Sequence, residues 1–415
     1  MLKKYINIYK NEFSNYNKSK FFKDLFAGIT VATVSLPLAM VLGIGNGTTI
    51  TAGILSSIFA GFILSLIGAT SFQINGAAAS TIAVLIVVSQ SYGENGVFLC
   101  GLISGFIILT CYLFKIGKYV TYIPKKVIDG LMTGIGLITI ISELPGFLGL
   151  NISSGTILQD LINTLIKIKS TNLIALIIGG ITILVIYLYP KKFNKKFPAT
   201  LLLLVVFIII NFIFRFNINT VGNLPSTLIT NNKLTFSFIT LPHIKELILP
   251  SISLAIIIIV KSTTCGISGA KIKKEKFDAH LEIFALGIAN IIIPFLGCVP
   301  SAGSISSTQT SIKSGQQTRL TGFFNSITLI AILLLFRDFI SVTPMSLLSG
   351  ILITVGIGMV KFPALKNIIT HPVDNIEFIV TAICALFFNL SIAIFLGILA
   401  YLIKTYIDKI LNTKK

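Results

Sequence analysis

Two short stretches, GATSFQINGAAAST at residues 68–81 and GCVPSAGSISST at residues 297–308, share one pattern and decide the fold. Each runs from a glycine through a few extended residues into a row of small and hydroxyl side chains, and each lies between hydrophobic segments. In a membrane protein, a pair of broken segments in corresponding places of the two halves is typical of a transporter's substrate site. A helix that begins inside the membrane leaves free backbone N–H groups, which attract an anion. We therefore expect a transporter of a small anion.

The composition excludes a soluble globular protein. Of the 415 residues, 54% are hydrophobic and 11% are charged, whereas soluble domains carry about 25% charged residues. The five cysteines are scattered singly, without CxxC spacing, so we expect small core residues and neither a metal site nor another cofactor. The net charge of +19 comes from basic clusters between hydrophobic runs, as in cytoplasmic loops, and does not indicate a nucleic-acid partner.

Hydropathy predicts an all-α polytopic membrane protein with fourteen transmembrane segments. The third and tenth are short and rich in small polar residues, which predicts half-helices that line a cavity enclosed by protein. The extended pieces before them, residues 72–75 and 298–301, are expected to pair as short strands. The fourteen segments are 25–43, 51–67, 76–90, 96–114, 127–143, 172–189, 200–214, 247–263, 281–296, 303–313, 321–337, 344–359, 376–390 and 391–407.

The distribution of charge predicts the topology. With the N-terminus inside and an even number of spans, most lysines and arginines fall in cytoplasmic segments. Fourteen spans divide into seven plus seven, and an odd number per repeat makes the second repeat inverted. The predicted divisions are a cytoplasmic N-terminal segment at 1–24, a first repeat at 25–216, an inter-repeat loop at 217–246, a second repeat at 247–407 and a short cytoplasmic tail at 408–415.

Four parts of the chain resemble the SulP sulfate-permease family of anion transporters. They are DLFAGITVA at 24–32 with SLPLA at 35–39, QINGAA at 73–78, GSISST at 303–308 with SGQQTRLTG at 314–322, and LSGILITVGIGMV at 348–360. The resemblance implies a bacterial family member with a seven-plus-seven inverted repeat, in which a core domain of spans 1–4 and 8–11 moves against a gate domain of spans 5–7 and 12–14 in a homodimer. It implies sulfate, bicarbonate, chloride, oxalate or dicarboxylates as substrates.

The chain departs from that family in three places. The C-terminal STAS domain that usually follows the last span is not expected here. The acidic residue of the eighth span, a sodium ligand in the bicarbonate branch, is replaced by Lys261. The arginine usual in the tenth span is replaced by Ser307. The positive charge has moved from one wall of the expected site to the other, which argues against sodium coupling.

Lys261 is the charged residue that we place within a span and away from its ends. Such a residue costs at least ~2.5–3.5 kcal/mol on insertion scales, which makes it a functional candidate by default. As an ammonium it is a built-in counter-ion for the substrate, or a proton carrier if burial lowers its pKa. The alternative is a lysine that snorkels from a helix end near Val260.

The remaining candidate substrate-binding residues line the two broken segments. Their backbone N–H groups and hydroxyls would face the anion, although small residues also serve close helix packing in membranes. Ser306 is the hydroxyl that we favour, and Leu38 and Leu42 are expected to form an apolar wall. The candidates on the broken segments are Gly76, Ala77, Ala78, Ala79 and Ser80 in the first half, and Gly303, Ser304, Ile305, Ser306 and Ser307 in the second.

Several acidic residues are assigned other roles. Asp129 and Glu143, at the ends of the fifth span, are interpreted as interface anchors or gating groups. Asp24 and Glu377 are interpreted as solvated or dipole-complementing groups at span ends. Glu282, in a stretch that resembles the family, is given a structural role.

These observations predict a secondary active transporter of a small inorganic anion, not an enzyme, that works by elevator-type alternating access. We expect a homodimer in the bilayer of the bacterial inner membrane with both termini in the cytoplasm. An uncoupled anion channel is the main alternative, because a fixed lysine removes the need for a coupling ion. A nucleobase-type transporter of the same fold would need carboxylates in the eighth and tenth spans, and neither span has one. A non-transporting scaffold or sensor leaves the costly broken segments without a purpose.

Overall fold

The computed structural model describes residues 2–115, 124–150, 157–190, 199–222, 224, 227–228, 232–365, 375–387 and 390–413. The described chain is mostly helical, because a helix satisfies the backbone N–H and C=O groups of an apolar segment internally. Six of its helices are long and apolar enough to cross a membrane, and several shorter apolar helices accompany them. The predicted number of fourteen spans stays a prediction.

Elements of the first half begin at Leu2 and end before the long polar segment. They are α1 (Leu2–Phe13), α2 (Lys18–Gly45), α3 (Ile50–Ile67), β1 (Asn75–Ala77), η1 (Ala79–Thr81), α4 (Ile82–Leu113), α5 (Lys125–Phe147), α6 (Ile157–Ile166), η4 (Ile168–Ser170), α7 (Leu173–Leu188) and α9 (Ala199–Phe214).

In the second half, two long helices again precede a short strand. The elements of this half are η5 (Phe236–Phe238), α10 (Leu241–Lys273), α11 (Ala279–Ile292), η6 (Ile293–Leu296), β2 (Ser301–Gly303), α12 (Ile305–Lys313), α13 (Leu320–Leu335), α14 (Arg337–Ser341), α15 (Met345–Met359), α17 (Ile376–Phe387) and α18 (Leu390–Thr413).

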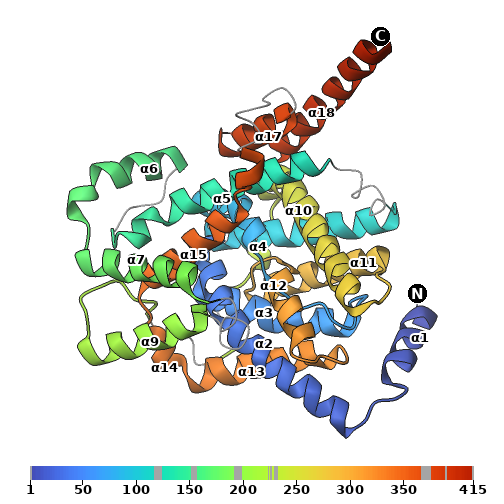
Figure 1. Cartoon of the computed structure of the whole chain (residues 1–415), viewed down its shortest axis with the longest axis horizontal. Helices are drawn as coiled ribbons and strands as arrows, with labels where there is room; N and C mark the ends of the chain where they lie inside the picture. The colour runs from blue at the N-terminus through green and yellow to red at the C-terminus, as the bar shows by residue number, and fades with distance from the viewer. Residues whose placement is uncertain are drawn as a thin grey trace.

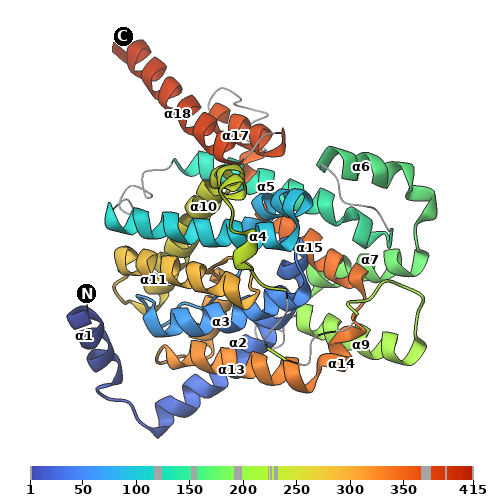
Figure 2. The same ribbon diagram turned by 180° about the vertical axis from the view of Figure 1, so that it is seen from behind.

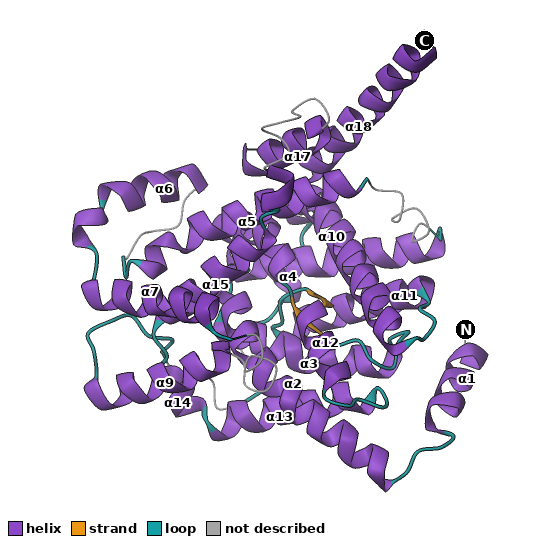
Figure 3. Cartoon of the chain, in the orientation of Figure 1, coloured by secondary structure: helices purple, strands orange, loops and turns teal. Residues whose placement is uncertain are grey.

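The two halves meet in a small antiparallel sheet at the middle of the molecule (Figure 3). Strand β1 pairs with β2 so that Gly76 lies opposite Ala302. The N–H of Ser304 donates to the carbonyl of Ile74 across the same pair, at 2.9 Å. The pairing satisfies backbone groups that lipid cannot, as expected from the sequence.

Both strands begin three residues later than predicted. Residues 70–73 form a turn instead, in which the N–H of Gln73 donates to Thr70 Oγ1 at 3.1 Å. On the other side, the N–H of Cys298 donates to the carbonyl of Ile293 and so continues the end of η6. In each case local hydrogen bonds keep the first predicted residues out of the sheet.

We describe the helices in two groups, named after the core and gate domains expected from the sequence. The core group comprises α2, α3, α4, α10, α11, α12 and α13, in which α10 and α11 lie on α4 and α13 lies on α2 and α3. The gate group comprises α5, α7, α9, α15, α17 and α18, in which α15 and α17 lie on α5. Figures 1 and 2 show α7 and α9 at one edge of the molecule and α11 and α1 at the opposite edge.

Most predicted spans coincide with helices, although the ends of several differ. The predicted third and fourth spans correspond to η1 with the first part of α4 and to the rest of α4, and a break at Gly93 separates the two parts. Gly93 has φ +64° and ψ −164°, a conformation that glycine adopts without a steric penalty. Helix α6 is an element that hydropathy did not predict, because it lies between the predicted fifth and sixth spans.

The predicted loop between the repeats also carries structure. The segment 217–246 contains η5 and the first turn of α10, while residues 223, 225–226 and 229–231 lie outside the described chain. Helix α18 continues past the predicted end of the last span to Thr413, so helix extends into the predicted tail; residues 414–415 lie outside the described chain. Both the predicted loop between the repeats and the predicted tail therefore contain helix.

Candidate functional site

The start of the first half-helix is held in place by Asn46, the C-cap residue of α2. Its Nδ2 donates to the carbonyl of Ala78 at 3.3 Å, and its Oδ1 accepts from Thr81 Oγ1 at 2.7 Å. Thr81 Oγ1 also approaches the carbonyl of Ala78, at 2.7 Å. Ala78, in an extended conformation, is the N-cap of η1, and among the described residues no side chain caps the first backbone N–H groups there.

The start of the second half-helix is more fully capped. Ser304 is the N-cap of α12, and its Oγ accepts from the N–H of Ser307 at 3.4 Å. The same Oγ lies 3.0 Å from the hydroxyl of Ser307. Strand β2 is fixed by Ser262 and Asn290: the N–H of Gly303 donates to Ser262 Oγ at 2.9 Å, and Asn290 bonds both the N–H and the carbonyl of Ser301.

One cavity joins the two half-helices to the predicted lysine. It has a volume of about 510 Å³ and is lined by Ser80 from η1, Lys261 from α10 and Ile305 from α12. The first helical residue of α12 and the middle residue of η1 therefore face the same space as Lys261. Three residues predicted from separate parts of the sequence thus meet in one cavity.

The gate group supplies the opposite wall. Helix α5 contributes Lys125 and Asp129 together with several aliphatic side chains, and Lys361 follows the end of α15. The three lysines and one aspartate give the lining a formal charge of +2. Within the described chain Lys261 has no carboxylate within ion-pair distance. An anion in the cavity would meet an excess of positive charge.

Ser80 is the polar side chain of the cavity that most needs a ligand. The residue is 1% exposed, and its hydroxyl has no hydrogen-bond partner among the described residues. A buried hydroxyl without a partner is costly, by roughly 1–3 kcal/mol. An anion in the cavity would accept this hydrogen bond as well as those of the adjacent backbone N–H groups.

The structure places the other predicted residues around this cavity without making them part of its lining. Ala78 and Ala79 lie at the start of η1, whereas Gly76 and Ala77 lie in β1 and Gly303 in β2. The N–H of Gly303 is already bonded, so it cannot donate to an anion at the same time.

On the α12 side, Ser304 and Ser307 bond to each other, and Ser306 is exposed. Leu42 is buried in the apolar core and Leu38 packs against it. Their binding roles stay predictions.

Sequence reasoning missed the gate-side lysines. In the sequence, Lys125 and Lys361 belong to the basic clusters between hydrophobic runs, and Asp129 lies near the end of a predicted span. They reach the cavity because the start of α5 and the end of α15 lie beside the core group, a neighbourhood that hydropathy does not report. Lys361 is held there by the bond from its N–H to Thr133 Oγ1, at 3.1 Å.

Asp24 and Glu377 are buried, so the prediction that they are solvated was wrong, while the alternative of a dipole-complementing role stays a prediction. Asp24 is fully buried, and its Oδ1 accepts from the N–H groups of Gln317 and Thr318 at 2.7 and 3.0 Å. Glu377 is 3% exposed, and its Oε1 lies 3.6 Å from Nζ of Lys126. Their partners come from distant parts of the chain, which turns apparent span ends into buried polar contacts.

The loop that leads into β1 rests on two buried groups. Glu282 accepts from the N–H of Ala69 at 3.0 Å and from Gln73 Nε2 at 2.9 Å, which agrees with the structural role given to it. The ring of Phe72 lies against Gly269, where a β-carbon would collide with it. The loop before the first half-helix is therefore fixed from α10 and α11.

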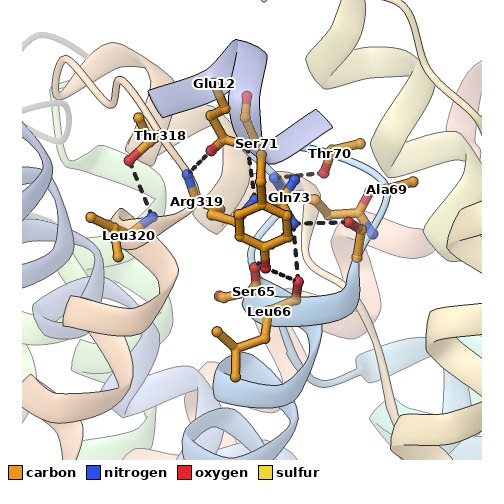
Figure 4. Close-up of polar contacts among 12 residues, drawn as sticks. Glu12, Ser65, Leu66, Ala69, Thr70, Ser71, Gln73, Thr318, Arg319 and Leu320 are labelled. Carbon is orange, nitrogen blue, oxygen red and sulfur yellow. Dashed lines mark hydrogen bonds and ion pairs between the residues drawn. The ribbon is translucent and has the colours of Figure 1, made fainter. Parts of the chain in front are cut away.

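Another buried group, Arg319, binds the carbonyl end of α3 (Figure 4). Its side chain is 3% exposed, and its Nε lies 2.8 Å from Oε2 of Glu12 in α1. Its Nη1 donates to the carbonyls of Leu66 and Gly68 at 3.1 and 3.2 Å, and its guanidinium lies over the ring of Tyr9. A cation at the carbonyl end of a helix is favoured by the helix dipole. Arg319 thus joins α1, α3 and the loop before β1.

Comparison with known proteins places this arrangement in a family. The sequence profile of the sulfate permease family matches residues 21–384. The chain belongs to the sulfate permease family. This confirms the resemblance seen in the sequence, and it places the chain among membrane transporters of anions.

Two relatives show the extent of the similarity. YvdB of Bacillus subtilis is 27% identical over 398 residues, which cover 94% of this chain and 74% of YvdB. The bicarbonate transporter BicA of Picosynechococcus is 27% identical over 360 residues, covering 83% of this chain and 62% of BicA. The chain thus spans about three quarters of one relative and just over three fifths of the other.

Solved structures share the fold at lower identity. The transmembrane domain of a cyanobacterial BicA superposes with a TM-score of 0.81 at 22% identity, covering 92% of this chain and 98% of that domain. Murine Slc26a9, an anion transporter solved in an inward-facing state, has a TM-score of 0.84 at 18% identity, covering 95% of this chain and 70% of that chain. The helical architecture is therefore shared across the bacterial and mammalian proteins.

Proposed function

We propose that this protein is a secondary active transporter of a small inorganic anion of the sulfate, bicarbonate or chloride class. The observation that carries the proposal is the cavity that brings Lys261, the unpartnered hydroxyl of Ser80 and the first residue of α12 together. The anion binds between the N-termini of the third and tenth spans with Lys261 beside it. Family membership and the named activity of BicA support the class of substrate.

The mechanism is elevator-type alternating access. The β1–β2 pair joins both half-helices to the core group, so that the two N-termini move as one unit. A second cavity, of about 220 Å³, lies along the same seam and is lined by Tyr92 and by Glu246 near the other end of α10. A carrier that exposes its site alternately to the two sides needs a cavity at each end of the interface between the core group and the gate group.

The charge of the cavity argues against sodium coupling. The ammonium of Lys261 stands where the bicarbonate branch has an acidic sodium ligand, and two further lysines line the cavity. A sodium ion placed among these ammonium groups would be repelled, whereas an anion neutralises them. The carrier is a homodimer in the bacterial inner membrane. Both of its termini lie in the cytoplasm, an orientation that the distribution of basic residues supports.

The test is uptake of labelled sulfate, bicarbonate and chloride into proteoliposomes, with and without a sodium or proton gradient. Lys261→Ala is compared with Lys245→Ala, an exposed lysine on the same helix. Sodium-independent uptake of one anion that is lost in Lys261→Ala and kept in Lys245→Ala supports the proposal. Sodium-driven uptake that survives Lys261→Ala refutes the role of Lys261. Unitary currents in planar bilayers would identify an uncoupled channel instead of a carrier.

A further inference from the structure

The walls of the Lys261 cavity are mostly apolar. Helix α5 presents Met132 and Ile135, and α10 presents Ile256 and Val260, beside the lysine. On the α12 side the lining residue is Ile305, not a serine. Polar groups are few, so the cavity resembles an organic-ligand pocket, which is mostly hydrophobic with a small number of placed polar groups.

The size of the cavity is also typical of a site for an organic ligand. Its volume of about 510 Å³ falls in the range of roughly 300–1,000 Å³ that is typical of sites for small organic molecules. An inorganic anion has the bulk of only a few water molecules, each about 30 Å³. An inorganic anion bound at Lys261 and Ser80 would leave most of the apolar wall in contact with water.

The supply of donors also limits which anion fits best. Lys125 and Lys361 line the gate side of the cavity together with Asp129. The donors on the half-helix side are the ammonium of Lys261, the hydroxyl of Ser80 and the adjoining backbone N–H groups. A divalent, strongly hydrated anion loses more water against aliphatic walls than these donors replace, and each unreplaced hydrogen bond is costly. An organic monoanion keeps its charge in one small head, and burial of its apolar part is favourable.

We propose that this cavity binds an amphiphilic organic monoanion, with an oxyanion head at Lys261 and Ser80 and a short aliphatic or aromatic body against Met132, Ile135 and Ile256. The head is of the carboxylate or sulfonate class. The inference rests on the proposed function, because it concerns the same cavity, and it adds an organic class of anion to the inorganic anions proposed there.

The experiment measures binding of an alkanesulfonate series, from methanesulfonate to pentanesulfonate, to the purified full chain in nanodiscs by isothermal titration. Sulfonates stay ionised at all working pH values, so no neutral form crosses the bilayer and the charge does not change with length. Each buried methylene strengthens binding by up to roughly fourfold. We expect affinity to rise at least ~10-fold from methanesulfonate to pentanesulfonate. Pentanol and pentylammonium, which lack the anionic head, are expected not to bind.

Matched variants locate the two parts of the ligand. Met132→Gln and Ile256→Thr are expected to flatten the dependence on chain length, whereas Val87→Thr, in the second cavity, leaves it unchanged. Lys261→Met is expected to weaken binding of every sulfonate, and Lys245→Met to leave it as in wild type. Elution on size exclusion and the apparent melting temperature show which variants are folded, and the series on the wild-type chain needs no variant.

The outcomes separate this inference from the proposed function. Transport of an inorganic anion together with binding that does not depend on chain length overturns the inference and leaves the proposed function standing. Dependence on chain length that persists in both Met132→Gln and Ile256→Thr overturns it as well, because the apolar body then lies elsewhere. Equal binding of pentanol or pentylammonium shows partition into apolar surface and overturns it. Failure of every anion, inorganic and organic, to bind removes both.

Discussion

The contact between Glu12 and Arg319 gives a prediction that can be worked through from the structure. Replacing Glu12 with glutamine keeps the shape of the side chain and removes its charge. Glu12 accepts two hydrogen bonds from Arg319, from its backbone N–H and its Nε, at 2.6 and 2.8 Å. Both side chains are at least nine-tenths buried, so water cannot replace what is lost.

The expected cost is about 3 kcal/mol of α1 docking free energy. Removing one partner of a buried ion pair typically costs ~3–5 kcal/mol, because the other charge stays buried without a counter-charge. The glutamine oxygen still accepts one bond, and the carbonyls of Leu66 and Gly68 still bind the guanidinium, which places the estimate at the lower end. At ~1.4 kcal/mol for each factor of ten, the undocked population of α1 rises roughly 100-fold.

Hydrogen–deuterium exchange of the amides of α1 measures this population, because they exchange through local opening of the helix from the core group. Lys10→Gln is the matched control: it removes a charge from an exposed position of the same helix, and surface changes of this kind stay within about ±0.5 kcal/mol. The double variant Glu12→Gln with Arg319→Met is expected to lose less than the sum of the single variants. Exchange in Glu12→Gln within threefold of wild type would refute the reasoning.

Three further variants test other parts of the structure. Ser80→Ala removes a buried hydroxyl that has no partner, so thermal stability should stay the same or rise slightly, while anion affinity should fall about 5- to 10-fold in a binding titration; a matching fall in stability would contradict the site. Asp24→Asn leaves one acceptor for the groups that bond the buried carboxylate and should lower the free energy of unfolding by about 2–4 kcal/mol, seen as a lower apparent melting temperature; an unchanged melting temperature would count against it. Burial and the nearby Glu282 carboxylate raise the pKa of Tyr5 from 10.0 to about 12, so the folded state keeps the phenolic proton longer than the unfolded state does. Its contribution to α1 docking should be present below pH 10 and be lost as the pH rises through 12, as limited proteolysis of α1 would show, and Tyr5→Phe should remove that part of the pH dependence.

The broken segments and Lys261 could be predicted because each stands out locally. A row of small residues between apolar runs marks a half-helix, and a lysine preceded by five aliphatic residues is conspicuous on composition alone. Hydropathy also placed most helices, since each apolar segment must satisfy its own backbone groups. These features depend on near neighbours in the sequence.

The rest could not be predicted, because it depends on contacts between distant segments. Lys361 carries no local sign that separates it from other basic residues near helix ends, yet it lines the cavity. Asp24 resembles a solvated residue at a span end, but its partners lie some 290 residues later. The loop before β1 is fixed by Glu282, which accepts from Gln73 although it belongs to the other half of the chain.

The buried ion pair between Arg319 and Glu12 has a consequence for the synthesis of the protein. The two residues lie 307 positions apart, and at ~5–20 residues per second the ribosome needs roughly 15 to 60 s to synthesise the segment between them. For that interval Glu12 of the nascent chain lacks its buried counter-charge, whereas Tyr5 and Tyr9 of α1 can already bond the carbonyls at the end of α3. The contacts of the first helix to leave the ribosome are therefore completed only when the second half of the chain has been made.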